Sequence, residues 1–292
     1  MSTDLKGSAS RSEYVQVRGL RYHVRRWGEP DAPMLFLAHG WMDLSATFET
    51  VVQGLTPRFQ VLIPDWRGFG LSEKDPNGYW FQDYVADLDA LADHYSPDQS
   101  ILLAGHSMGA QISAIFAGLR PKRVRQLAIL DGLFLPDGDP STIAKRYRIW
   151  LNAIRSPASS PSYTSFDELA GRIQKRHSKL SLESCRFIAR CWGVLDDDGM
   201  VRLQSDPRHL VDMPRTYSQA ESDAIWSCIV APVLFVDGGD SPFHKQLDSA
   251  EVSRRRKLFQ QREEIVIPGA GHMLHFEVPV ELSDALNNFF HD

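Results

Sequence analysis

The stretch that decides the fold spans residues 101–109 and reads Ile-Leu-Leu-Ala-Gly-His-Ser-Met-Gly. It begins with a continuous apolar run, which is typical of a strand buried on both faces of a sheet. The small and apolar residues from Met108 to Leu119 then predict a helix. A serine between two glycines, at the turn from a strand to a helix, is the setting of a nucleophile elbow. Ser107 is therefore the predicted nucleophile, and its glycine neighbours would allow a turn too tight for side chains.

Short apolar runs like the one before Ser107 recur along the chain and alternate with helical patterns. The other predicted strands are Tyr14–Val17, Leu20–Trp27, Met34–Ala38, Val61–Ile63, Leu127–Leu130, Val233–Val236 and Glu264–Ile267. Further helices are predicted at Phe81–Tyr95 and Val280–Phe290. Strands that alternate with helices favour an α/β fold, with a mainly parallel eight-stranded sheet covered by helices.

The alternation stops between Phe134 and Trp226. Apolar residues at helical spacing from Phe166 to Leu180 predict one helix, and Ser181 would cap a second. We therefore predict a helical lid at residues 134–226, inserted after the sixth strand. The core would then consist of residues 14–133 and 227–292, and the polar residues 1–13 would form a flexible N-terminal tail.

Composition and charge limit the class of protein. Hydrophobic residues make up 43% of the chain and its net charge is −5, which is ordinary for a globular protein and unfavourable for nucleic-acid binding. No apolar stretch reaches roughly 18 residues, and the N-terminus lacks the apolar centre of a signal peptide. We therefore expect no membrane span and a cytoplasmic location. The three cysteines lack metal-binding spacing, so we expect reduced thiols. We also expect neither a metal nor another cofactor, because acyl transfer through Ser107 needs none.

A serine needs a base to become a strong nucleophile, and His272 is the predicted base. It ends the sequence Pro-Gly-Ala-Gly-His at residues 268–272, directly after the predicted strand Glu264–Ile267. The glycines would let a short loop carry the imidazole over the edge of the sheet. His275 lies close by in the sequence, and we interpret it as a packing or loop residue.

The acid that should orient the imidazole is the least determined part of the predicted site. Asp240 is the first choice, because it follows the strand Val233–Val236, the first strand after the lid. Asp131 is an alternative, because it ends the strand immediately before the lid, and Asp237 is a third candidate. A structural role at the entry to the lid would also explain Asp131.

Acyl transfer also requires hydrogen-bond donors for the oxyanion that forms on the substrate. The N–H of Met108, directly after Ser107, is one predicted donor. The second is the N–H of Trp41, in the loop His-Gly-Trp-Met-Asp at residues 39–43, where Gly40 permits the backbone to turn inward. We interpret His39 as hydrogen-bonded within this loop rather than catalytic.

Six segments, in chain order, resemble the α/β-hydrolase superfamily. They are HGW at 39–41, DWRGFGLS at 65–72, GHSMG at 105–109, LAILDG at 127–132, VDGGD at 236–240 and GAGHMLHFEVP at 269–279. The pattern is most similar to the esterase and epoxide-hydrolase-like branch, and HGWMD is similar to the serine hydrolase-like proteins. The acid loop departs from the usual pattern, because Gly238 lies two residues before Asp240 rather than three.

The resemblance implies Ser107 as nucleophile, His272 as base, and Trp41 and Met108 as oxyanion donors. Epoxide hydrolases and haloalkane dehalogenases of this branch have an aspartate where Ser107 stands, so the serine favours acyl-enzyme chemistry instead. Aromatic residues of the lid and the pocket walls favour a small apolar or aromatic carboxylic ester as substrate. These residues are Tyr147, Trp150, Trp192, Tyr217 and Trp226. A carbon–carbon bond hydrolase, a thioesterase or a lactonase with the same triad is an alternative, as is a non-catalytic ligand receptor.

Overall fold

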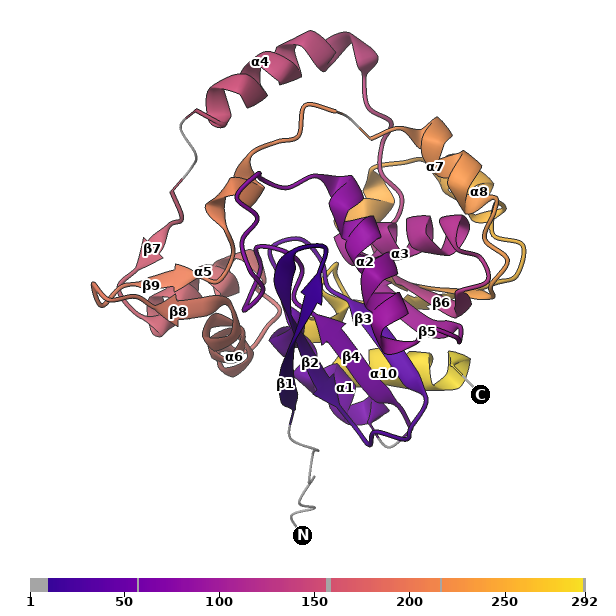
Figure 1. Ribbon diagram of the computed structural model, residues 1–292, viewed down its shortest axis with the longest axis horizontal. Coiled ribbons are helices and arrows are strands. Elements are labelled where there is room, and N and C mark those ends of the chain that lie inside the picture. The colour runs from indigo at the N-terminus through magenta and orange to yellow at the C-terminus, as the bar shows by residue number, and fades with distance from the viewer. Residues whose placement is uncertain (1–9, 57, 156–158, 216, 291–292) are drawn as a thin grey trace.

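The computed structural model describes residues 10–290, apart from residues 57, 156–158 and 216. Eight strands form one sheet in the order β1-β2-β4-β3-β5-β6-β10-β11 (Figure 1). They are β1 (Arg11–Val17), β2 (Leu20–Trp27), β3 (Met34–Ala38), β4 (Gln60–Pro64), β5 (Ile101–His106), β6 (Val124–Leu130), β10 (Val233–Gly238) and β11 (Arg262–Ile267). Strand β2 is antiparallel to β1 and β4, and the other pairs are parallel. The predicted eight-stranded, mainly parallel sheet is confirmed.

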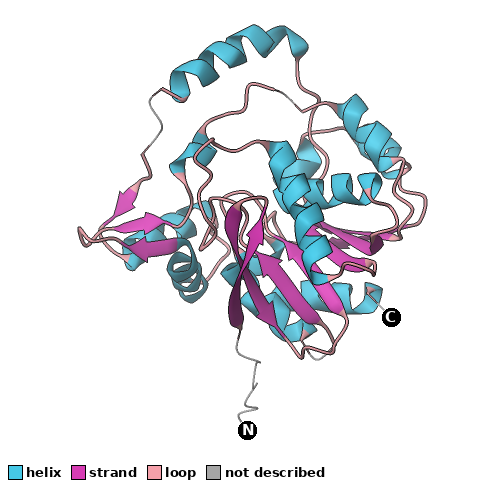
Figure 2. Cartoon of the chain, in the orientation of Figure 1, coloured by secondary structure: helices cyan, strands magenta, loops and turns pink. Residues whose placement is uncertain are grey.

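Helices cover both faces of this sheet (Figures 1 and 2). The core helices are α1 (Glu49–Leu55), α2 (Phe81–Tyr95), α3 (Met108–Leu119), α8 (Ser249–Arg256), α9 (Leu274–Glu277) and α10 (Pro279–Phe289). In β5, Leu103 packs with α2 and α3, whereas Leu102 and Ala104 pack with α1 and α10. Because side chains alternate between the faces, a strand covered on both faces is apolar throughout. Among the helices that the structure describes, none is long and apolar enough to cross a membrane.

The segment between β6 and β10 lies beside the sheet and above its edge (Figure 1). Its helices are α4 (Ile143–Ala153), α5 (Phe166–Arg176), α6 (Leu182–Trp192) and α7 (Gln219–Trp226), and its strands are β7 (Ser162–Tyr163), β8 (Gly193–Leu195) and β9 (Val201–Leu203). Short 3-10 helices lie at Ser45–Phe48, Pro140–Thr142, Pro207–Leu210 and Pro242–Lys245. The insertion of a helical region after the sixth strand is confirmed, and the hydroxyl of Ser181 caps α6 as expected.

The inserted region contains a small apolar core of its own. Leu169 and Ile173 of α5 pack there against Ile188 of α6 and Val201 of β9. Strands β7, β9 and β8 form a separate antiparallel sheet, which the sequence did not predict, because strands of two or three residues are too short to show alternation. Helix α4, by contrast, buries none of its side chains and stands away from the core (Figure 1).

The packing differs from the prediction at two boundaries, the C-terminal end of the lid and the end of the N-terminal tail. Helix α7 falls within the predicted lid at 134–226, but Trp226 joins the apolar core beside α3. A Cβ on Gly118 of α3 would lie only 2.3 Å from the carbonyl oxygen of Ile225, so the two helices are in close contact. At the N-terminus, residues 11–13 of the predicted tail pair with β2 as part of β1. Residues 1–9 of that tail lie outside the described residues, and the remaining division into core and lid stays a prediction.

Candidate active site

Ser107 lies at the turn between β5 and α3 in an unusual backbone conformation. Its φ of +53° and ψ of −115° are strained for a residue with a side chain, at a cost on the order of 1–3 kcal/mol. A Cβ on Gly105 would lie 2.4 Å from the carbonyl oxygen of Gly109, and one on Gly109 would lie 2.1 Å from that of Ala38. Close backbone contacts therefore require both glycines, and the tight turn leaves Ser107 partly exposed at the carboxyl end of the sheet.

The loop after β11 brings His272 to Ser107. Nε2 of His272 lies 3.0 Å from Oγ of Ser107. Nε2 of His106 donates a 2.8 Å hydrogen bond to the main-chain carbonyl of His272, since a carbonyl can only accept. Burial, followed by the charges of His272 and His275, lowers the pKa of His106 well below its usual value. His106 is therefore a neutral link between the nucleophile turn and the loop of the predicted base.

The carboxylate beside His272 belongs to Asp131. Its Oδ2 lies 2.6 Å from Nδ1 of His272 and also accepts a 2.6 Å hydrogen bond from the hydroxyl of Ser241. The N–H of Gly238 donates to Oδ1 at 3.3 Å, and the side chain is buried. Asp131 directly follows β6 and has a φ of +49°. A continuous hydrogen-bonded chain thus joins Asp131, His272 and Ser107.

Contrary to the prediction, the structure does not place Asp240 beside His272. The Asp240 side chain is 56% exposed and forms a 2.5 Å ion pair with Lys179. The reason lies in the length of β10, which continues to Gly238 and so carries Asp240 past the edge of the sheet. There the Asp240 N–H donates to the carbonyl of Ala270 at 2.8 Å. Asp131 replaces Asp240 as the candidate acid.

Two other residues weighed in the sequence, Asp237 for the acid and His275 beside the predicted base, contact different partners. Asp237 still lies within β10 and pairs with Arg256. The imidazole of His275 is buried and stacked on Phe48, with 4.2 Å between the ring centroids. Its Nε2 lies 3.0 Å from a carboxylate oxygen of Asp43. His275 therefore has the packing role that the sequence indicated.

The predicted oxyanion donors lie on two elements beside Ser107. Met108 is the first residue of α3, so its N–H lies at a helix N-terminus, where no acceptor exists within the helix. Trp41 lies in the loop after β3, and a Cβ on the preceding Gly40 would lie 3.2 Å from the Cβ of Ser107. Nδ1 of His39 donates to the carbonyl of Gly40 at 2.8 Å, because Nε2 accepts a main-chain N–H. Contact between these donors and a substrate stays a prediction.

A cavity of about 840 Å³ opens onto Ser107 and His272. Its walls come from the loop after β3, from α5 and α6, and from the loops after β10 and β11. Trp192 is the one predicted aromatic residue in its lining; Tyr147, Tyr217 and Trp226 line a second cavity of about 1050 Å³ beside α2, α3 and α7. Although the second cavity is larger, it is not lined by Ser107 or His272. The smaller cavity is therefore the candidate substrate site.

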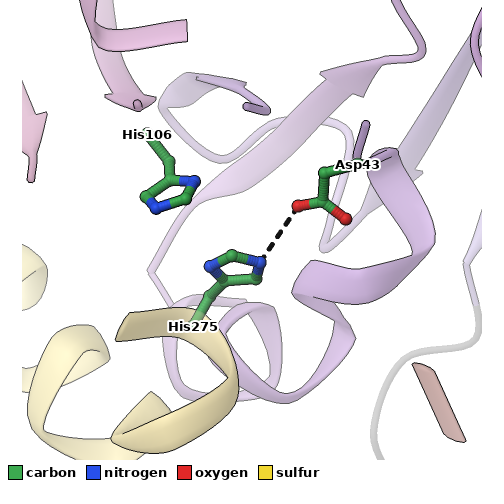
Figure 3. Close-up of side chains that lie close together, drawn as sticks. All are labelled: Asp43, His106 and His275. Atoms are coloured by element: carbon green, nitrogen blue, oxygen red, sulfur yellow. Dashed lines mark hydrogen bonds and ion pairs between the residues drawn. The ribbon is translucent and has the colours of Figure 1, made fainter. Parts of the chain in front are cut away.

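Asp43, His106 and His275 converge next to this site, and together they could hold a metal ion (Figure 3). One ligand atom from each residue lies within 4.8 Å of the others. Nδ1 of His106 and Nδ1 of His275 have no hydrogen-bond partner among the described residues. Asp43, however, already accepts hydrogen bonds from His275 and, at 2.9 Å, from the indole N–H of Trp192.

The partners of Asp43 explain its charge state. Burial alone would raise the pKa of Asp43, but the hydrogen bond and the charge of His275 outweigh burial and lower it to about 2. Trp192 belongs to α6, whereas His275 belongs to α9, which follows closely after the loop that carries His272. We interpret Asp43 as an ionised residue that joins the loop after β3 to the inserted region through Trp192 and to α9 through His275.

The family described as alpha/beta hydrolase fold matches residues 33–279, which include the turn at Ser107, the candidate acid Asp131 and the loop that carries His272. The chain belongs to the alpha/beta hydrolase fold family. The strand order of this hydrolase, and the position of Ser107 between β5 and α3, place the candidate site at the carboxyl ends of the parallel strands.

Two named relatives align with this hydrolase over nearly their whole length. The 2-(acetamidomethylene)succinate hydrolase of Mesorhizobium japonicum is 27% identical over 99% of this chain and 98% of its own. Serine hydrolase-like protein 2 of Homo sapiens is 28% identical over 91% of this chain and 89% of its own. The thioesterase domain from the curacin biosynthetic pathway has a TM-score of 0.83 at 23% identity, and the alignment covers 95% of this chain and 99% of that domain. The last similarity is one of fold.

Sequence reasoning missed Ser241, whose hydroxyl contacts the candidate acid. It also ranked Asp131 below Asp240. The dipeptide Asp131-Gly132, directly after an apolar strand, is a signal that favours Asp131. Aspartate tolerates positive φ better than most residues, and Gly132, at φ +81°, lets the backbone turn under His272.

Proposed function

We propose that this protein is a serine hydrolase that forms an acyl-enzyme on Ser107. The observation that carries the proposal is the unbroken hydrogen-bonded chain from Asp131 through His272 to Ser107. A serine hydroxyl becomes a strong nucleophile when a base lies within hydrogen-bonding distance and a third group orients that base. The 3.0 Å and 2.6 Å distances meet both requirements.

In the proposed mechanism, Nε2 of His272 takes the hydroxyl proton of Ser107 as its oxygen attacks the substrate carbonyl. Asp131 keeps Nδ1 of His272 protonated and stabilises the imidazolium that forms. The N–H groups of Trp41 and Met108 stabilise the oxyanion, and each such donor contributes on the order of 10²–10³ in rate. His272 then returns the proton to the leaving group and activates the water that releases the acyl group. The residues that carry this mechanism need no cofactor.

We propose a small carboxylic ester as the substrate. Apolar side chains of the cavity wall support this choice, among them Trp192 and Leu169 from the inserted region and Phe243 from the loop after β10. An apolar wall suits the acyl or alcohol part of an ester, which would lie beside Ser107.

Hydrolysis of an amide is the second candidate. The Mesorhizobium relative is named for a compound with an acetamido group, and that protein aligns with nearly the whole chain. An acetamide carbonyl is also an acyl group that an activated serine attacks, so the same triad would serve. The cytoplasmic location and the absence of nucleic-acid partners stay predictions from the sequence.

Labelling by a fluorophosphonate probe tests the proposal, because the probe reacts with activated serines. The wild-type protein should be labelled at Ser107 and should hydrolyse p-nitrophenyl butyrate, whereas Ser107→Ala should do neither. The variant should keep the wild-type circular dichroism spectrum and unfolding temperature. Equal ester turnover by Ser107→Ala would refute the proposal. A parallel assay with an N-acetyl p-nitroanilide would separate amide from ester hydrolysis.

A further inference from the structure

Two arginines of α5 line the cavity that contains Ser107. Arg172 and Arg176 are four residues apart, so they lie on the same face of the helix one turn from each other. Both side chains are exposed to the cavity or its mouth. The buried residue Ile173 of the same helix packs into the core of the inserted region and so fixes the helix in place. The cavity therefore has a cationic wall along α5, formed by Arg172 and Arg176.

The other charged groups of the cavity already have partners. Lys179 pairs with Asp240 at 2.5 Å. Glu277 accepts a 2.8 Å hydrogen bond from the N–H of Gly271, and Asp43 is held by His275 and Trp192. Within the described part of the chain, none of these three carboxylates forms a hydrogen bond or an ion pair with Arg172 or Arg176.

Arg172 and Arg176 form neither a hydrogen bond nor an ion pair with any residue that the structure describes. Glu168 lies one turn before Arg172, but its carboxylate is bound by the N–H and the hydroxyl of Thr164, at 2.7 and 2.8 Å. Burial and then the charge of Arg176 lower the pKa of the adjacent His177, and the opposing charge of Glu277 does not reverse this direction.

A guanidinium group matches a carboxylate in geometry, because two parallel N–H groups can donate to its two oxygens. We propose that Arg172 and Arg176 bind an anionic group, of the carboxylate class, on the substrate that Ser107 attacks. This inference rests on the proposed function and refines it. The substrate is then a monoester or monoamide of a dicarboxylic acid, or an ester with an acidic alcohol part, and hydrolysis of the first kind releases a dicarboxylate.

Paired esters of equal length test this inference. One pair is mono-p-nitrophenyl adipate and p-nitrophenyl hexanoate, and a longer pair is the suberate monoester and the octanoate. The wild-type protein should prefer the charged ester of at least one pair by about tenfold or more in kcat/KM, as charge-assisted hydrogen bonds typically provide. In the double variant Arg172→Gln/Arg176→Gln that preference should fall by about tenfold, mainly through KM. The ratio of the two esters serves as an internal control for misfolding.

Lys175→Gln is the matched control. Lys175 is an exposed cation on the same helix, but it is not part of the cavity lining. It should leave the ratio within about twofold of wild type, because exposed charges outside the site are screened by solvent. An equal loss in Lys175→Gln, or an unchanged ratio in the double arginine variant, would overturn the inference.

Binding of adipate to Ser107→Ala, measured by calorimetry, separates this inference from the proposed function. If Ser107 proves unreactive but Arg172→Gln/Arg176→Gln in this background weakens adipate binding, the anion site stands and the catalytic proposal fails. If Ser107 is acylated by both esters without a charge preference, the catalytic proposal stands and the anion site fails.

Discussion

The loops that follow β6 and β10 each carry an aspartate near the same edge of the sheet, but the two carboxylates have opposite surroundings. The strands are parallel neighbours, with Leu130 opposite Val236. Asp131, one residue after β6, is buried and accepts hydrogen bonds from His272 and Ser241. Asp240, after β10, is more than half exposed and pairs with a lysine.

The difference arises from where each chain leaves the sheet. Strand β6 ends at Leu130, and the positive φ of Asp131 turns the chain at once, which directs its side chain over the sheet edge. Strand β10 continues to Gly238, because it pairs with β11 up to Ile267. The backbone conformation at the end of a strand therefore decides whether an aspartate reaches the histidine. Its position after a particular strand is not sufficient.

Among substitutions at the two strand ends, Asp131→Asn should cause the largest loss of activity. Asparagine keeps the size of the side chain and tolerates positive φ, so the fold should survive. It cannot stabilise an imidazolium or hold His272 in the required tautomer, so kcat should fall by on the order of 10³–10⁴. Stopped assays with p-nitrophenyl butyrate measure this loss, and thermal unfolding checks the fold. A loss of less than about tenfold would contradict the assignment of Asp131 as the acid.

Ser241→Ala tests the contribution that the loop after β10 makes to the surroundings of Asp131. Ser241 is buried, and its hydroxyl donates to the same oxygen of Asp131 that faces His272. Removing this donor should lower kcat by about tenfold, since a hydrogen bond to a charged group contributes roughly 1.5 kcal/mol, with little change in KM. Ser241→Thr keeps the hydroxyl and should recover part of the rate. Equal losses in both variants would indicate a packing effect instead.

The same contrast explains which features the sequence could predict. Strands such as β3 and β5 are covered on both faces, so their apolar runs were recognisable, and Ser107 and His272 followed from their strand ends. The acid depended on one backbone turn at Asp131, which composition and periodicity do not encode. The short strands β7, β8 and β9 and the cationic wall at Arg172 depend on how the inserted region packs, which is a tertiary effect beyond local patterns.

Asp43 extends the comparison to a third aspartate, which is buried like Asp131 but lies outside the candidate triad. Its pKa falls from 3.8 in the unfolded chain to about 2 in the folded protein. The ionised group therefore stabilises the fold above pH 4, and this contribution is lost as the pH falls towards 2. A shift of nearly two units corresponds to about 2 kcal/mol.

Asp43→Asn should therefore lower the free energy of unfolding by about 2 kcal/mol at pH 6, and the deficit should shrink below pH 4. Urea unfolding of both proteins between pH 2.5 and 7 measures the difference. A deficit that stays constant across this range would show that packing, rather than the charge of Asp43, stabilises the loops.

Asp240→Asn should have the smallest effect. Both side chains of its ion pair with Lys179 are exposed, and such pairs contribute little to stability. We expect kcat/KM for p-nitrophenyl butyrate to stay within about threefold of wild type and the unfolding temperature to change little. The double variant Asp131→Asn/Asp240→Asn should have the same kcat/KM as Asp131→Asn alone, because Asp240 lies outside the hydrogen-bonded chain and does not contribute to catalysis. If the double variant were much slower than Asp131→Asn, Asp240 would be supplying the residual activity, and the two strand ends would be alternative positions for one acid.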